Sequence, residues 1–250
     1  MIGIRQEQRV TVLTLQREEK LNALSGVMES ELLAALTGEE VRDSRCVVFV
    51  GAGKAFSAGA DINEFRGADA ESIAAYYATT GDVYERIAAV PIPTIGAIHG
   101  WCLGGALEMA LAFDFRIADE TATFGLPEVQ LGIIPSSGGT HRLVRMLGPA
   151  KAKELMLLGR RFDAEEAKAL GLVTEVVPAG KALERALEVA HELTELPPLA
   201  VQTAKQAVDV MPEASREAGI LIERLAYAAL AQTTEAKDAV ESFTRRDRRP

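Results

Sequence analysis

Residues 94–118 read TIGAIHGWCLGGALEMALAFDFRIA, a stretch in which a helix follows one short strand and precedes another. Residues 94–98 form a short apolar run, which predicts a buried strand. Residues 104–113 begin at a glycine pair and predict a helix, and residues 115–118 predict the next strand. Short strands that alternate with helices are typical of an α/β protein with mostly parallel strands.

The same alternation continues on both sides of this stretch. Further strands are predicted at residues 10–15, 47–50 and 122–124. Ser25 is expected to cap a helix at its N-terminus, because its hydroxyl can accept from the free N–H groups of the first turn. Residues 70–90 predict one long helix, which the prolines after it would end.

The character of the chain changes after about residue 183, where no further strand is predicted. Pro197-Pro198 separates two helical patterns, and residues 213–244 predict helices only. We therefore expect two regions. Residues 1–190 form an α/β core that carries the functional site, and residues 191–250 form a separate helical region.

Composition excludes several classes of function. The chain has 250 residues, a net charge of −9 and a pI of about 5.0, which argues against a sequence-independent grip on nucleic acid. Cys46 and Cys102 are the only cysteines, too few for a disulfide framework or a zinc site. No secretory signal and no apolar stretch long enough for a membrane span is visible. The expected location is therefore the cytoplasm, without contact to membranes.

Two glycine-containing turns could supply backbone N–H groups to a ligand. Gly59 follows a predicted strand and permits backbone angles that other residues rarely adopt. Gly104 and Gly105 open a predicted helix, whose first N–H groups have no partner within the helix. Fixed N–H groups of this kind can stabilise a carbonyl oxygen that gains negative charge. Alternatively, either glycine segment serves only to make a tight turn.

Two glutamates lie beside these turns. Glu108 falls three residues after Gly105, one helical turn on, and its neighbours Leu107 and Met109 are apolar. A glutamate on an apolar helix is costly unless it is paired or functional. Glu128 follows Pro127, and by itself it is equally compatible with an acid at a helix N-terminus. Two carboxyl groups with different proton affinities can act as general base and general acid.

Three segments together carry a family resemblance: residues 55–62 (AFSAGADI), 101–108 (WCLGGALE) and 124–128 (FGLPE). They resemble the signature of the crotonase (enoyl-CoA hydratase/isomerase) superfamily, and the resemblance covers nearly the whole chain. It implies a spiral core of repeated ββα units and a C-terminal helical trimerisation region. It also implies a homotrimer or a dimer of trimers (a hexamer), and an acyl-CoA substrate of the kind used in fatty acid metabolism. Coenzyme A is then part of the substrate, and no metal or other cofactor is expected.

The resemblance also assigns roles to individual residues. Glu108 is implied as the base that activates water, and Glu128 as the acid that protonates C2. In an alternative version, both acids hold one water that supplies both fragments. The N–H groups of Ala60 and Gly105 form the implied oxyanion hole. Residues implied to bind the substrate or coenzyme A are Lys20, Ala58, Ala60, Asp61, Ile62 and Gly105.

The expected activity is that of an enoyl-CoA hydratase, a hydro-lyase that adds water reversibly to trans-2-enoyl-CoA. An enoyl-CoA isomerase, or another crotonase-type acyl-CoA enzyme, is the alternative, although isomerases commonly manage with one acid. A catalytically idle RNA-binding member and an acyl-CoA hydrolase are more distant alternatives. Leu126, Ser136 and Ser137 depart from residues that are common in hydratases, which leaves the preferred acyl chain open.

Overall fold

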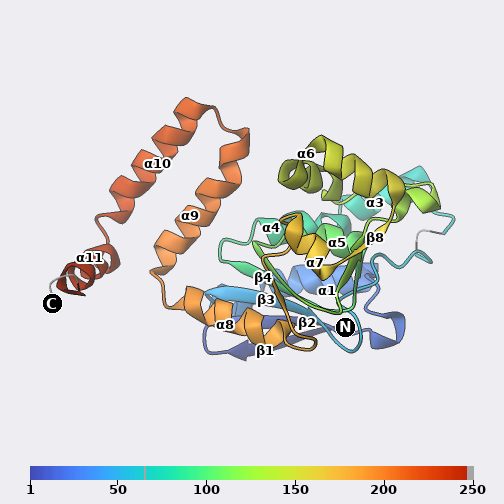
Figure 1. Ribbon diagram of the computed structural model, residues 1–250, viewed down its shortest axis with the longest axis horizontal. Coiled ribbons are helices and arrows are strands. Elements are labelled where there is room, and N and C mark those ends of the chain that lie inside the picture. The colour runs from blue at the N-terminus through green and yellow to red at the C-terminus, as the bar shows by residue number, and fades with distance from the viewer. Residues whose placement is uncertain (65, 247–250) are drawn as a thin grey trace. The chain divides into compact units, whose positions relative to one another are not determined.

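The computed structural model describes residues 1–64 and 66–246 (Figure 1), so the last four residues of the predicted helical region lie outside it. The chain divides into two compact units, of which the first ends at His191 and the second begins at Glu192. The first unit contains both β-sheets. The described part of the second unit contains only helices.

The larger sheet has six strands in the order β1-β2-β3-β4-β6-β9. Its strands are β1 (Ile2–Glu7), β2 (Val10–Leu15), β3 (Cys46–Gly51), β4 (Thr94–Ile98), β6 (Phe115–Asp119) and β9 (Glu175–Val177). Only β1 runs antiparallel to its neighbour, and the other pairs are parallel. Every residue of β3 and β4 is buried, as expected for strands that are covered on both faces.

The first unit also contains a smaller sheet of three strands. It consists of β5 (Trp101–Leu103), β7 (Thr123–Gly125) and β8 (Arg161–Asp163) in that order. The chain passes from β4 to β5 and then into the helix α5 (Gly105–Ala110). It passes likewise from β6 to β7, and then through the 3-10 helix η3 (Glu128–Leu131) into α6 (Gly139–Leu158). Each turn thus gives a strand to each sheet before a helix, which is a ββα repeat.

The remaining helices of the first unit are η1 (Glu18–Lys20), α1 (Gly26–Thr37), α2 (Glu39–Arg42), α3 (Ala70–Tyr77), η2 (Thr80–Asp82), α4 (Val83–Ala88) and α7 (Ala164–Ala169). They are followed by α8 (Ala182–Thr194), which runs past the boundary at His191. The second unit continues with α9 (Pro198–Val210), η4 (Met211–Glu213), α10 (Arg216–Leu230) and α11 (Thr234–Arg246). As predicted, the Ser25 hydroxyl caps α1, accepting a hydrogen bond from the N–H of Met28.

The prediction of one continuous helix over residues 70–90 was wrong. The segment contains α3, η2 and α4 as separate pieces. The Thr79 hydroxyl donates to the carbonyls of Ala75 and Tyr76 and so competes with the regular helical hydrogen bonds at the end of α3. The observed α5 is also shorter than the predicted helix over residues 104–113.

An aromatic cluster packs beneath α5. The rings of Phe49 and Phe113 stack with their centroids 4.5 Å apart, and Phe56 meets Phe113 edge-on. All three side chains are buried, so they anchor the chain just beyond α5 against the large sheet. Aromatic contacts of this geometry add to the stability gained from burial alone.

Arg116, which is buried on β6, fixes the end of α5. Its guanidinium donates to the carbonyls of Ala110 and Phe113 and to that of Leu172 in the segment before β9. Burial lowers the pKa of Arg116 to about 10, but the group stays charged at neutral pH. One cation therefore satisfies three buried carbonyls and ties α5 to the sheet.

No helix among the described residues is both long and apolar enough to cross a lipid bilayer.

Replacing this cation tests its role. Arg116→Met keeps much of the side-chain volume but removes the donor to the buried carbonyls of Phe113 and Leu172, while that of Ala110 keeps the Phe113 N–H. It should lower the free energy of unfolding by about 3 kcal/mol, measured by urea denaturation. Arg5→Met, at an exposed position on β1, is the control and should change it by less than about 0.5 kcal/mol. A loss below about 1 kcal/mol at position 116 would contradict this role.

Candidate active site

Glu108 and Glu128 lie on different turns of the ββα spiral but belong to one buried site. Glu108 is on α5, and Glu128 is the first residue of η3. Their exposed fractions are 3% and 8%, although carboxylates are seldom buried without a reason. The negative charge of Glu108 is one of the influences that raise the pKa of Glu128, which indicates that the two groups are close.

Backbone N–H groups hold the Glu108 carboxylate. Its Oε1 accepts from the N–H of Ser137 at 2.8 Å and from that of Gly139 at 2.9 Å, and its Oε2 accepts from the N–H of Ser136 at 3.4 Å. All three donors belong to the turn that leads into α6. Such donors stabilise the ionised form of a carboxyl group. Because they are backbone groups, the serines at positions 136 and 137 leave this cradle intact.

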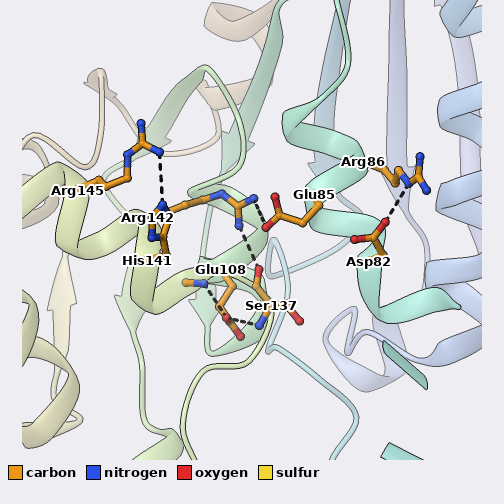
Figure 2. A network of polar contacts seen from close by, with 9 residues as sticks. Asp82, Glu85, Arg86, Glu108, Ser137, His141, Arg142 and Arg145 are labelled. Carbon is orange, nitrogen blue, oxygen red and sulfur yellow. Dashed lines mark hydrogen bonds and ion pairs between the residues drawn. The ribbon is translucent and has the colours of Figure 1, made fainter. Parts of the chain in front are cut away.

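Arg142 supports the turn that cradles Glu108 (Figure 2). Its guanidinium donates to the Ser137 carbonyl at 3.1 Å and to the Glu85 carboxylate at 2.7 Å. Arg142 comes from α6 and Glu85 from α4, so the ion pair connects two helices on either side of the turn. The N–H donors to Glu108 are thereby fixed in place before any ligand binds.

The carboxyl group of Glu128, unlike that of Glu108, lacks hydrogen-bond donors within the described segments. Neither of its carboxylate oxygens has a hydrogen-bond partner among the residues that the structure describes. Burial raises the pKa of Glu128 to about 7, so the group carries a proton through the acid range up to neutrality. A Cβ built on Gly104 would lie only 3.2 Å from Glu128 Oε1, which places the carboxyl group at the N-terminus of α5.

The N–H groups of Ala60 and Gly105 are next to each other. A Cβ built on Gly105 would lie 3.5 Å from the backbone nitrogen of Ala60. In the described part of the chain, neither N–H donates to a protein acceptor. Gly105 is the first residue of α5, where the helix dipole also favours negative charge. The pair is therefore free to bind an oxygen of a ligand.

Two glycines permit this approach of backbone to backbone. Gly59 has a φ of 96°, and a Cβ there would lie 2.5 Å from the Leu103 carbonyl oxygen. Gly104 has a φ of 54°, also in the region that favours glycine, and its Cβ would press on Glu128. A larger residue at position 59 would push the turn and the helix apart, and one at position 104 would displace the Glu128 carboxyl group.

The other predicted binding residues lie on two paired loops. Ala58 donates its N–H to the Leu21 carbonyl, and the N–H of Asp61 donates to the Leu24 carbonyl. These bonds join the loop of residues 58–61 to the loop that carries Lys20. Ile62 follows as a side chain that is 61% exposed. The structure thus brings Lys20, Ala58, Asp61 and Ile62 to one region, while Ala60 of this loop has its N–H next to Gly105.

The carboxylate of Asp61 is already engaged within the protein. It forms a 2.9 Å ion pair with Arg17 and accepts two hydrogen bonds from Asn63. The Asn63 N–H and the Arg17 guanidinium hold the pKa of Asp61 below its usual range. Asp61 therefore contributes to the loop's shape through a fixed ion pair, and Arg17 is a supporting residue that the sequence analysis did not identify.

Sequence reasoning also missed Arg142, Tyr84 and the buried Glu29. No local pattern marks Arg142 or Tyr84, because each acts through residues distant in sequence. Glu29 carried only a weak signal, since it follows the apolar Met28 and lies one turn before Leu32 on the helix. No group of three or more His, Cys, Asp or Glu side chains is placed to hold a metal ion within residues 1–64 and 66–246.

Comparison with known proteins supports one family. The family model for enoyl-CoA hydratase/isomerase matches residues 5–249. A protein of Mycobacterium tuberculosis named as a probable enoyl-CoA hydratase is 39% identical over 97% of this chain and 94% of its own length. The 2,3-dehydroadipyl-CoA hydratase of Escherichia coli is 38% identical over 96% of this chain and 94% of its own.

Solved structures lead to the same conclusion. The crystal structure of an enoyl-CoA hydratase from Bacillus anthracis matches with a TM-score of 0.92 and 38% identity, covering 98% of this chain and 96% of that one. An enoyl-CoA hydratase structure from Geobacillus kaustophilus gives a TM-score of 0.93 at 37% identity, covering 100% and 96%. The predicted crotonase-like α/β fold is confirmed.

The raised pKa of Glu128 predicts a measurable pH dependence of stability. A carboxyl group whose pKa is higher in the folded than in the unfolded chain binds more protons when folded. The ionisation of Glu128 therefore has no effect on the free energy of unfolding in acid. It lowers that free energy as the pH rises from 4.5 to about 7. Glu128→Gln should raise the free energy of unfolding by about 2 kcal/mol at pH 8 and by less than about 1 kcal/mol at pH 5, measured by urea denaturation.

Glu120→Gln, at an exposed position, is the matched control and should have no effect at either pH. If Glu128→Gln gave equal changes at both pH values, or destabilised the protein at pH 8, the account of a buried carboxyl that resists ionisation would be wrong.

Proposed function

The chain belongs to the enoyl-CoA hydratase/isomerase family, and we propose that it is an enoyl-CoA hydratase. Its reaction is the reversible addition of water to a trans-2-enoyl-CoA thioester, which gives 3-hydroxyacyl-CoA. The observation that carries the proposal is the contrast between two buried carboxyl groups beside a pair of free N–H groups. Glu108 is cradled by backbone donors, and Glu128 has no partner among the described residues.

The N–H groups of Ala60 and Gly105 take the thioester oxygen. When water attacks C3, electron density moves through C2 to this oxygen, which becomes an enolate. Two donors already fixed in position stabilise that charge without reorganising during the reaction. The N-terminus of α5 adds a favourable dipole, because Gly105 is its first residue.

Glu108 takes a proton from the attacking water. The N–H donors of Ser137 and Gly139 hold its carboxylate in position, so that it can act as the base. Arg142 keeps the donors in place through the Ser137 carbonyl. As the oxygen of water bonds to C3, its proton passes to Glu108 and the C2–C3 double bond releases an electron pair toward C2.

Glu128 delivers a proton to C2. Its pKa of about 7 means that a large share of the molecules carry this proton at neutral pH. The new C2–H bond uses the electron pair from the enolate, so the thioester carbonyl is restored. One proton is lost to Glu108 and one is given by Glu128, and exchange with solvent resets both groups. We prefer this division of roles to a single water held by both acids, because the two environments differ.

The rival within the family is an enoyl-CoA isomerase, which moves a proton between carbons. One carboxyl group is sufficient for that task, whereas hydration needs a base for water and an acid for C2. The presence of both Glu108 and Glu128 in one buried site favours hydration. No metal or redox cofactor is needed in this scheme, since the two acids handle the protons and the N–H pair stabilises the oxyanion.

Binding of coenzyme A is assigned to the paired loops. Lys20, Ala58 and Ile62 supply an ammonium group, a backbone and an exposed apolar side chain on neighbouring segments. Asp61 shapes this region through its ion pair with Arg17. The acyl-chain length is left open, because Leu126, Ser136 and Ser137 differ from the residues that are common in hydratases.

We further propose a homotrimer or a dimer of trimers, formed through the helical region of residues 191–250. Exposed apolar side chains occur along its helices, including Leu221 and Leu225 on α10 and Val240 on α11. Leu221 and Leu225 are four residues apart and so share one face of α10. Large exposed apolar faces are typical of interaction sites. A cytoplasmic location remains part of the proposal.

Substitution of the two acids tests the proposed function. The purified protein should consume crotonyl-CoA, followed by the loss of enoyl-thioester absorbance. Glu108→Gln and Glu128→Gln should each lower kcat by about a hundredfold or more, because each removes a proton-transfer group and changes volume little. Glu120→Gln, an exposed control, should hydrate at the parent's rate. A variant at position 108 or 128 with near-parental kcat would contradict the role of that acid.

A further inference from the structure

A third buried carboxyl group, that of Glu29, shares the neighbours Tyr76 and Tyr84 with Glu108. Glu29 is on α1, 2% exposed, beside the buried Met28 and one turn before the buried Leu32. Its Oε2 accepts a hydrogen bond from the Tyr76 hydroxyl at 2.7 Å, and its Oε1 accepts from the Tyr84 hydroxyl at 3.3 Å. Three separate helices, α1, α3 and α4, thus meet in one polar cluster.

This cluster borders the proposed oxyanion hole. A Cβ built on Gly105 would lie 3.2 Å from the Tyr84 hydroxyl and 3.5 Å from the nitrogen of Ala60. The Tyr84 hydroxyl and one of the two N–H donors therefore flank the same point. Glu108 also lies close enough to raise the pKa of both tyrosines by its charge. The substrate carbons next to the thioester must therefore pass near Tyr84.

Burial of these polar groups carries an energetic cost. A buried carboxyl group with two hydroxyls contributes less to stability than well-packed apolar side chains of similar volume would. Among the described residues, each Glu29 oxygen accepts one hydrogen bond, which leaves it a second lone pair. Burial raises the pKa of Glu29 to about 7, so near neutrality the group can both accept and donate hydrogen bonds. The cluster is thus equipped to bind another polar group.

The charge of the surroundings limits what that group can be. The charges of Glu29 and Glu108 act on both tyrosines, and that of Glu64 acts on Glu29, so a carboxylate on the acyl chain would be repelled. An ammonium group would be attracted, but it would also pair with Glu108 and block the base. A neutral group that both donates and accepts, such as a hydroxyl, fits the cluster without either conflict.

We propose that Glu29, Tyr76 and Tyr84 form a specificity site that selects enoyl-CoA thioesters whose acyl group carries a hydroxyl close to the double bond. This inference rests on the proposed function, since it concerns the substrate of the same reaction. A site built around hydrogen bonds discriminates strongly against an analogue that lacks the polar group, because its own buried groups are then left unpaired.

The test compares two substrates of nearly equal size, trans-4-hydroxybut-2-enoyl-CoA and trans-pent-2-enoyl-CoA. The quantity measured is the ratio of their kcat/KM values, hydroxylated over hydrocarbon. In the parent this ratio should be at least about 10, and in Tyr84→Phe it should fall about tenfold. Glu29→Gln should lower it by at least about threefold. Comparing ratios between variants cancels the intrinsic difference in reactivity of the two substrates.

Tyr227→Phe is the matched control, because Tyr227 is 76% exposed in the second unit and should leave the ratio unchanged. Circular dichroism checks that each variant is folded. Tyr84→Phe and Glu29→Gln each remove a different hydrogen-bonding group of the cluster. If one variant fails to fold, the other still tests the proposal. A parent ratio below one overturns the proposal.

A ratio within about twofold of the parent's in the folded variants also overturns the proposal, even where the rates for both substrates fall together. That pattern would indicate a structural role only. If the parent hydrated crotonyl-CoA but showed no preference for the hydroxylated substrate, the specificity site alone would be wrong. If it hydrated no enoyl-CoA, the proposed function would be wrong as well.

Discussion

The close approach of the turn at residues 57–60 to the N-terminus of α5 is the constraint on which the site depends. At this crossing two stretches of backbone come so near that a Cβ on Gly59 would overlap the Leu103 carbonyl. The approach leaves the N–H groups of Ala60 and Gly105 side by side and free. It also sets the position of Glu108, one helical turn along α5, relative to any oxygen that these N–H groups bind. Small residues at the crossing are therefore a geometric requirement.

The carboxyl groups of Glu108 and Glu128 lie beside this crossing but differ in their hydrogen-bond partners. The turn before α6 provides N–H donors to Glu108, and Arg142 holds that turn through a carbonyl and an ion pair to Glu85. Glu128 receives no such help and resists ionisation because it is buried. The structure bears an energetic cost for an unpartnered buried carboxyl group, as is common at functional sites. Arg116 and the aromatic cluster under α5 offset part of that cost by fixing the helix.

The sequence allowed the fold class and the central strands to be predicted because the signals there are local. The apolar run of residues 94–98 coincides with β4, and the pattern at 115–118 lies within β6. The strands β5, β8 and β9 have three residues each, too few for a periodic pattern, and were not predicted. The one long helix expected over residues 70–90 does not form, because side-chain hydrogen bonds of Thr79 compete with the backbone hydrogen bonds of the helix.

The same distinction applies to the site. Glu108 could be singled out because an acid on an apolar helix is unusual, whereas Glu128 was marked only by the family resemblance. The supports of the site, Arg142 and the pair of Arg17 with Asp61, depend on contacts between segments far apart in sequence. Such contacts leave no local pattern, so only the folded chain reveals them.

Hydration, as opposed to isomerisation, is tested most directly by following crotonyl-CoA in D2O by NMR. The proposed enzyme should add one deuteron at C2 and a hydroxyl group at C3, with no label at C4. Deuterium at C4 without addition of oxygen at C3 would show proton movement along the chain by an isomerase, and would contradict the account.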